Sequence, residues 1–229
     1  MSSIYTPKQG KEFFTPFGPM LGYYRMPPEL VDALNGAMSD RLEDHSDHLV
    51  GKVRQELRFD QNLINLAARG LGQMLIEYHA RAKTRCAFGD YDHTTKKYAL
   101  DVMSGWFIRQ FENEYNPLHI HTQCALSCVG YLMLPDGIEE EWAEDYQDHH
   151  PSHGHLQFAH GTDVHYSVCN FMVKPRVGDF WIFPSYMFHC VYPFKSKGER
   201  RSFSMNVTIE EEEVEQPSPQ PATAKTWRL

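Results

Sequence analysis

The sequence predicts an α+β fold, in which N-terminal helices support a β-sandwich or barrel formed by the second half of the chain. Two observations lead to this prediction. Apolar residues recur at helical spacing before about residue 98 and at strand spacing after it. Aromatic residues make up 13% of the 229 residues, and they favour β structure. We therefore expect one domain over residues 1–209, with helical support over about 13–97 and a barrel core over 98–209.

The first half contains an opening strand and two helices. Residues 13–26 (FFTPFGPMLGYYRM) are aromatic and punctuated by Gly and Pro, which indicates a strand with turns. Residues 27–38 begin with two prolines, which suit a first helical turn. The clearest helix covers residues 60–82, where Asp60 can cap the N-terminus. Gly70 and Gly72 weaken this helix locally and allow close packing. Its apolar stripe consists of Leu63, Leu66, Ala67, Leu71, Met74, Leu75 and Tyr78.

The second half is predicted to contain six main strands, over residues 102–113, 125–134, 167–175, 177–185, 189–194 and 200–209. Between the second and third strands, residues 136–155 are polar and acidic, which indicates a long loop or an inserted hairpin. Residues 210–229 are acidic and then rich in Pro, Ser and Ala, so we expect a mobile tail.

Composition excludes several classes of function. The net charge of -8 and the pI of about 5.9 give no basic footprint for nucleic acid. No apolar run approaches the roughly 20 residues of a membrane span, and the first residues lack the apolar core of a signal peptide. The five cysteines form no CxxC pair, as in a reduced, cytoplasmic protein. We expect neither nucleic-acid nor membrane partners, and a homodimer is compatible with the sequence.

Three histidines form a candidate metal site. His119 and His121 are two residues apart, so in an extended chain their side chains project to the same face. Their Cα atoms would lie about 6–7 Å apart, close enough to share one ion. His189 stands among aromatic residues, where a polar group needs a partner. Three imidazoles suit Fe, Cu, Zn or Ni. The alternative is that these are core histidines bonded to the backbone.

The last predicted strand has one polar and one apolar face. Arg200, Ser202, Ser204 and Asn206 alternate with Arg201, Phe203, Met205 and Val207. The polar face has one arginine and otherwise small groups, which suits a barrel interior that binds a small anion. A guanidinium can bind a carboxylate through two parallel hydrogen bonds. A solvated outer face is the alternative.

Taken together, these motifs resemble those of the 2-oxoglutarate/Fe(II)-dependent oxygenases, and most of all the prolyl-hydroxylase-like group of marine bacteria and their phages. The resemblance rests on His119-x-His121, Ser127 to Tyr131, GDFWIFPSYMFH (178–189) and RRSFSMN (200–206), within a likeness that covers about residues 13–209. It implies a double-stranded β-helix (jelly-roll) barrel with helices packed on the larger sheet. It also implies Fe(II) and 2-oxoglutarate as cofactors, and hydroxylation of an unidentified small molecule or peptide, with a prolyl residue as one candidate.

Carried over onto this sequence, the resemblance assigns the metal to His119, His121 and His189, and 2-oxoglutarate to Arg200, Ser202 and Tyr131. It implies no catalytic residue beyond the metal centre. One position departs from the family pattern, because His121 stands where the motif has Asp or Glu. We expect a three-His iron site; the alternative is that only His119 and His189 bind the metal, and an acid from elsewhere or water completes the set. A cupin-type three-His metalloenzyme that does not use 2-oxoglutarate is an alternative, although the Glu expected soon after the histidine pair is absent. A non-catalytic metal- or ligand-binding barrel is another alternative.

Overall fold

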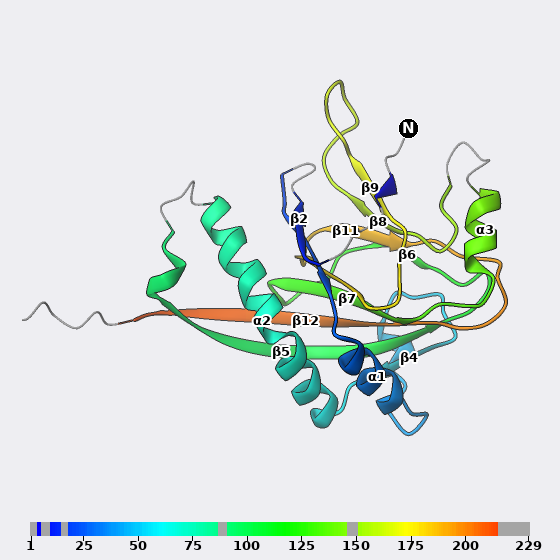
Figure 1. Cartoon of the computed structure of the whole chain (residues 1–229), viewed down its shortest axis with the longest axis horizontal. Helices are drawn as coiled ribbons and strands as arrows, with labels where there is room; N and C mark the ends of the chain where they lie inside the picture. The colour runs from blue at the N-terminus through cyan, green and yellow to red at the C-terminus, as the bar shows by residue number, and fades with distance from the viewer. Residues whose placement is uncertain (1–3, 6–9, 15–17, 87–90, 146–150, 215–229) are drawn as a thin grey trace, which may run out of the picture.

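The computed structural model describes residues 4–5, 10–14, 18–86, 91–145 and 151–214. In these residues two β-sheets face each other, and helices flank the larger sheet (Figure 1). The helices are α1 (Pro28–Ala37), α2 (Gln61–Cys86) and α3 (Ile138–Asp145), with short 3-10 helices η1 (Ser46–His48) and η2 (His93–Thr95). The strands are β1 (Ile4–Tyr5), β2 (Glu12–Phe14), β3 (Leu21–Arg25), β4 (Gln55–Arg58), β5 (Lys96–Gln110), β6 (Asn116–His119), β7 (Leu126–Met133), β8 (Leu156–Ala159), β9 (Asn170–Val173), β10 (Asp179–Pro184), β11 (Phe188–Val191) and β12 (Arg200–Glu213).

Strands β5 to β12 form a jelly roll. In the larger sheet the neighbouring order is β10-β7-β12-β5, and in the smaller sheet it is β9-β8-β11-β6. The chain changes sheet at every connection from β5 to β12 except the one between β8 and β9, which pair with each other. This order confirms the predicted double-stranded β-helix. Strands β2 and β3 extend the larger sheet beyond β10, and β4 extends it beyond β5.

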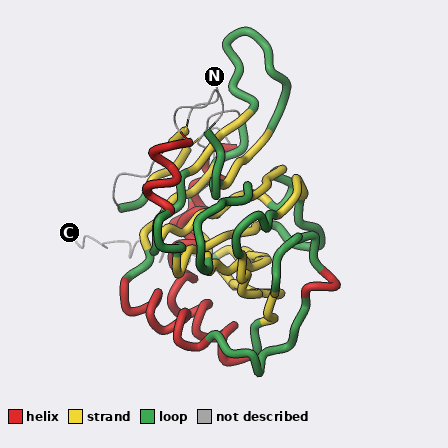
Figure 2. The backbone as a smooth tube through the Cα atoms, turned by 90° about the vertical axis from the view of Figure 1, so that its right-hand side faces the viewer, coloured by secondary structure: helices red, strands yellow, loops and turns green. Residues whose placement is uncertain are grey.

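Helices α1 and α2 cover the outer face of the larger sheet, and Figure 2 shows the long helices on one side of the strands. The stripe of α2 packs with Phe203, Met205 and Val207 of β12 in one buried cluster. Asp60 caps α2 as predicted, because its Oδ1 accepts a hydrogen bond of 2.9 Å from the N–H of Leu63. Gly72 lies against the sheet, since a Cβ there would come within 3.2 Å of Leu100 on β5. The sequence therefore places the helices on the sheet correctly.

The space between the two sheets is divided into two parts. Near β3, β8, β9 and β10 it is filled by an apolar cluster that includes Tyr23, Phe158 and Trp181. The rings of Tyr23 and Trp181 lie 5.1 Å apart, centroid to centroid. Near β4, β5 and β6 a cavity remains, lined by polar side chains from both sheets. The packed part holds the sheets at a fixed separation, and the other part is free to bind ligands.

Strand β12 has the predicted alternation. Phe203, Met205 and Val207 are fully buried under the helices, while Ser202, Ser204 and Asn206 line the cavity between the sheets. Arg200 is also inside, with only 2% of its surface exposed. The polar face of this strand is therefore the barrel interior and not a solvated surface.

Four details differ from the sequence predictions. Residues 13–97 supply strand β4 of the larger sheet, which was not predicted, in addition to the helices and the expected opening strand, β3. The acidic segment 136–155 contains helix α3 in place of an inserted hairpin, and His155 within this segment is buried. Strand β12 continues to Glu213, four residues into the predicted tail, because it pairs with the start of β5 as far as Lys96. Residues 215–229, the rest of that tail, lie outside the described residues. Among the described residues, no helix is both long and apolar enough to cross a membrane.

Candidate metal centre

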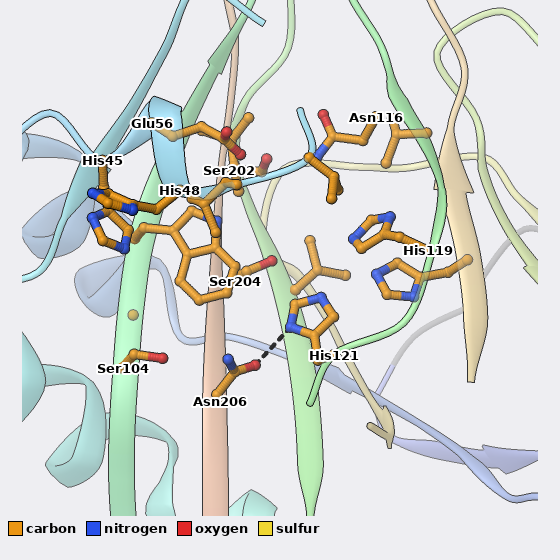
Figure 3. A pocket seen from close by; sticks show the side chains of 18 of the residues that line it. His45, His48, Glu56, Ser104, Asn116, His119, His121, Ser202, Ser204 and Asn206 are labelled. Carbon is orange, nitrogen blue, oxygen red and sulfur yellow. Dashed lines mark hydrogen bonds between the residues drawn. The ribbon is translucent and has the colours of Figure 1, made fainter. Parts of the chain in front are cut away.

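The three predicted histidines converge on the wall of the cavity, where Figure 3 shows His119 and His121. His119 is the last residue of β6, and its register partner across the smaller sheet is His189 of β11. The ring centroids lie 4.2 Å apart for His119 and His189, 5.1 Å for His121 and His189, and 5.3 Å for His119 and His121. One ring nitrogen from each histidine lies within 4.8 Å of the other two. This spacing allows all three to bind one ion.

Each of these imidazoles is held through its Nδ1 atom. His119 Nδ1 lies 2.7 Å from the Pro117 carbonyl oxygen, and His189 Nδ1 lies 2.9 Å from the Met187 carbonyl oxygen. His121 Nδ1 lies 2.6 Å from Oδ1 of Asn206. All three partners are acceptors, so each Nδ1 carries the proton and donates it. The tautomers follow from these partners, and they leave all three Nε2 lone pairs free for a metal.

Burial keeps the three imidazoles neutral. It lowers the pKa of His121 to about 4, against the opposing hydrogen bond to Asn206. It also lowers the pKa of His119, and holds the pKa of His189 well below its usual value. Metal ligands must be unprotonated, so the site is ready for an ion at neutral pH without releasing protons from these rings. Neutral nitrogen donors fit Fe(II), and they also suit Cu, Zn and Ni.

The metal centre opens onto a cavity of about 500 Å³, a volume typical of small-molecule sites. Trp106 of β5 stacks on His121, with 5.6 Å between ring centroids and 18° between ring planes. Stacking and the bond to Asn206 together fix the orientation of His121. The remaining wall includes His45, His48, Glu56, Ser104, Ile108, Asn116, Val129 and Val191.

The residues predicted to hold 2-oxoglutarate cluster in the barrel. Tyr131 and Ser202 are register partners on β7 and β12, and both line the cavity. Arg200 does not line it directly, but its guanidinium carbon lies 5.8 Å from the centroid of the Tyr131 ring. That guanidinium donates to the carbonyl oxygen of Gly154 at 3.0 Å and to Oε1 of Gln110.

Two buried donors in this cluster lack partners among the described residues, namely Tyr131 Oη and Arg200 Nε. Burial lowers the pKa of Arg200 to about 10 and raises that of Tyr131 to about 12, so both keep their protons at neutral pH. No described carboxylate forms an ion pair with Arg200. A buried cation and a free hydroxyl donor suit a ligand carboxylate.

Sequence reasoning missed part of the site. His121 lies in the loop after β6 and not in an extended strand. Its side chain faces the same site as that of His119, as predicted, but strand alternation is not the cause. Asn206 was predicted to face inward, but not to hold His121. Glu56, His45 and His48 carry no recognisable motif, and only the pairing of β4 with β5 brings Glu56 to the cavity.

Comparison with known proteins finds one family model that resembles the barrel. Residues 104–206 match the family model described as "Putative 2OG-Fe(II) oxygenase". Over these residues, the barrel of this chain is similar to the 2OG-Fe(II) oxygenases. The match covers the histidine centre, Tyr131, and the face of β12 that lines the cavity. No curated protein matches the sequence.

Several solved structures share similarity with most of the chain. A Pseudomonas putida prolyl-4-hydroxylase is 17% identical, with 87% of this chain and 92% of that chain covered and a TM-score of 0.48. The viral collagen prolyl hydroxylase of Paramecium Bursaria Chlorella virus-1, in complex with 2-oxoglutarate, is 14% identical, with coverage of 87% and 96% and a TM-score of 0.46. HygX from Streptomyces hygroscopicus, with nickel and 2-oxoglutarate bound, is 10% identical, with coverage of 81% and 82% and a TM-score of 0.47. The likeness to the oxygenase family rests on the match over residues 104–206.

Proposed function

We propose that the protein is an Fe(II)- and 2-oxoglutarate-dependent hydroxylase whose iron is held by His119, His121 and His189. The single observation that supports this ligand set best is the convergence of three imidazoles whose Nδ1 atoms all donate to fixed acceptors. The same hydrogen bonds orient the Nε2 lone pairs before the ion arrives. Residues that only pack in a core would not need three such acceptors around one point.

The 2-oxoglutarate end of the site is assigned to Arg200, Tyr131 and Ser202. Arg200 would pair with the carboxylate distant from the metal, and the Tyr131 hydroxyl would add a second hydrogen bond. Both groups are buried, and both have an unused donor among the described residues. A ligand carboxylate here would satisfy these donors and neutralise a buried charge.

Bound iron and 2-oxoglutarate supply oxygen activation, with 2-oxoglutarate converted to succinate and CO₂ while one oxygen atom enters a substrate C–H bond. The chain itself contributes position and exclusion of water. Trp106 and Asn206 hold His121 from two sides. The apolar cluster around Trp181 seals the other end of the barrel.

The substrate in this proposal is a small molecule or a peptide, and a prolyl residue is one candidate. The net charge of -8 argues against nucleic acid. All five cysteines are free, which fits the cytoplasm. A homodimer is an assembly that sedimentation of the purified protein would detect.

Substitution of the three histidines tests the proposal. His119→Ala and His189→Ala should abolish succinate release, because each removes a metal ligand. His121→Leu should lose most Fe(II) binding, whereas His121→Asp should retain it, since a carboxylate in this position gives the more usual donor set. Anaerobic Fe(II) titration and succinate assays measure both properties.

Two outcomes would change the assignment. If His121→Leu binds iron and turns over like the parent, His121 only positions the site, and a two-His centre replaces the three-His centre. If the parent binds metal but not 2-oxoglutarate, the cupin-type alternative replaces the oxygenase. Binding of neither would indicate a non-catalytic barrel.

A further inference from the structure

Glu56 is a buried acid on the wall of the cavity that holds the histidine centre. Only 1% of its surface is exposed, and Oε2 has no hydrogen-bond partner among the described residues. Ionised carboxylates are rarely buried without a partner, because they lose their hydration and gain nothing in return. The position of this side chain therefore requires an explanation other than packing.

The fold does not depend on the Glu56 carboxylate. The N–H of Glu56 donates to Ser46 Oγ at 2.9 Å, and its carbonyl oxygen accepts from the N–H of His45 at 2.7 Å. Its backbone also pairs with Ile108 in the sheet. These contacts use main-chain atoms of Glu56, so a neutral side chain would keep them all.

No cation of the described chain neutralises Glu56. Arg58, two residues further along β4, forms its ion pair with Glu43 at 3.4 Å. Arg54 pairs with Glu114 at 4.0 Å. Gly51 also confines the acid, because a Cβ at that position would lie 2.8 Å from Oε2. The Glu56 carboxylate is thus held in place. When it is ionised, its charge has no counter-ion in the described chain, and a ligand can supply one.

The acid stands apart from the carboxylate-binding end of the cavity. Tyr131, Ser202, Ile108 and Glu56 are register partners in one row across β7, β12, β5 and β4. Strands β12 and β4 are two steps apart, which is about 10 Å between backbones. In Figure 3, Glu56 lies with His45 and His48 on one side of the cavity, and His119 lies on the other. Glu56 and the residues assigned to the 2-oxoglutarate carboxylate thus occupy different parts of the cavity.

We propose that Glu56 binds a protonated amine or guanidinium of the primary substrate, which is therefore an organic cation. A charge-assisted hydrogen bond from the ligand would satisfy Oε2 and compensate the buried charge. The same acid would repel 2-oxoglutarate, whose carboxylate distant from the metal is assigned to Arg200. The identification of the cation as a substrate rests on the proposed function, whereas the cation subsite does not depend on that function.

Binding of simple probes to the full chain tests this subsite. The protein is loaded with Zn(II) and 2-oxoglutarate at pH 8, and dissociation constants are measured by ligand-observed NMR. The probes are n-pentylammonium and n-butylguanidinium, with n-pentanol as the neutral counterpart and pentanoate as the anionic one. We expect each cation to bind at least about tenfold more tightly than pentanol, and pentanoate to bind most weakly.

Glu56→Gln should remove this preference, while Asp47→Asn should retain it. Asp47 is an exposed acid of η1 in the same part of the chain, so its substitution changes the net charge equally. A melting curve verifies that Glu56→Gln is folded, and Glu56→Asp, which keeps the charge on a shorter arm, is the second variant if it is not. Glu56→Asp should weaken cation binding while keeping the order of the probes.

The subsite is refuted if the cations bind the parent no better than pentanol, or if a folded Glu56→Gln keeps the preference. Metal and 2-oxoglutarate affinities are measured on the same preparations. A parent that shows Glu56-dependent cation binding but no 2-oxoglutarate binding would refute the proposed function and retain the subsite. Normal 2-oxoglutarate binding without a preference for the cations would refute the subsite and retain the proposed function.

Discussion

Replacement of Glu56 by glutamine should stabilise the protein, and the gain should depend on pH. Burial, with the charge of Asp44 as a smaller contribution, raises the pKa of the Glu56 carboxyl from 4.5 to about 7. The folded protein therefore keeps a proton that the unfolded chain releases at lower pH. The stability contributed by this group is fully present below about pH 4.5 and is lost as the pH rises through about 7.

The size of the stability change follows from the difference between the two pKa values of Glu56. Each unit of pKa corresponds to about 1.4 kcal/mol, so the change between 4.5 and about 7 is worth up to about 3 kcal/mol of unfolding free energy. Glutamine does not titrate. The free energy of unfolding of Glu56→Gln minus that of the parent should therefore rise by up to about 3 kcal/mol between pH 4.5 and pH 8. An ordinary domain has only about 5–15 kcal/mol in total, so the change is easily measured.

Urea unfolding followed by tryptophan fluorescence, at several pH values between 4.5 and 8, measures this difference. A chelator keeps metal away from the histidines, whose binding would otherwise add its own pH dependence. Asp47→Asn, which removes an exposed acid from the same part of the chain, is the control for the change in net charge. A flat difference for Glu56→Gln, or a variant less stable than the parent at pH 8, would refute the reasoning about the buried charge.

Two further predictions concern strand β12. Arg200→Leu should weaken 2-oxoglutarate binding by on the order of 2 to 4 kcal/mol, because it removes a buried charge-assisted pair. Calorimetry should show little change in metal affinity, and undiminished 2-oxoglutarate binding would mean that Arg200 is not its partner. Asn206→Leu removes the acceptor for His121 Nδ1 and should lower metal affinity about 10- to 100-fold in a chelator competition. Ser204→Ala, on the same face, should bind metal normally, and an equal loss in both variants would show that the effect is not specific to the hydrogen bond.

The elements that could be predicted from the sequence are those whose pattern is local. Helix α2 shows its apolar stripe and its capping Asp60 within one stretch of chain. Strand β12 shows its inner and outer faces through strict alternation, and the structure confirms both. His119 and His121 are neighbours in sequence, so their convergence needed only His189 from elsewhere.

The remaining features depend on long-range pairing. Strand β4 is a four-residue edge strand, QELR, without an apolar alternation to reveal it. Glu56 reaches the cavity only because β4 pairs with β5, about 50 residues later in the chain. The bond between His121 and Asn206 joins residues 85 positions apart. No local pattern encodes these contacts, whereas the register of the sheet fixes them.

The register of the sheet also places Glu56 and the residues proposed to bind the metal and 2-oxoglutarate on different strands around one cavity. His119, His189 and Arg200 belong to strands of the eight-stranded barrel, and His121 lies in the loop after β6; each of these four side chains is held by a hydrogen bond. Glu56 belongs to β4, which extends the larger sheet beyond that barrel; β4 pairs with β5 on one side and is bridged to residues 43–45 on the other. A side chain on such an edge strand can change without disturbing the order of the barrel strands, because its backbone bonds are independent of its chemistry. Under the proposed function, the charge of the substrate would be selected at β4, while the barrel and the loop after β6 would set the position of the metal and of 2-oxoglutarate.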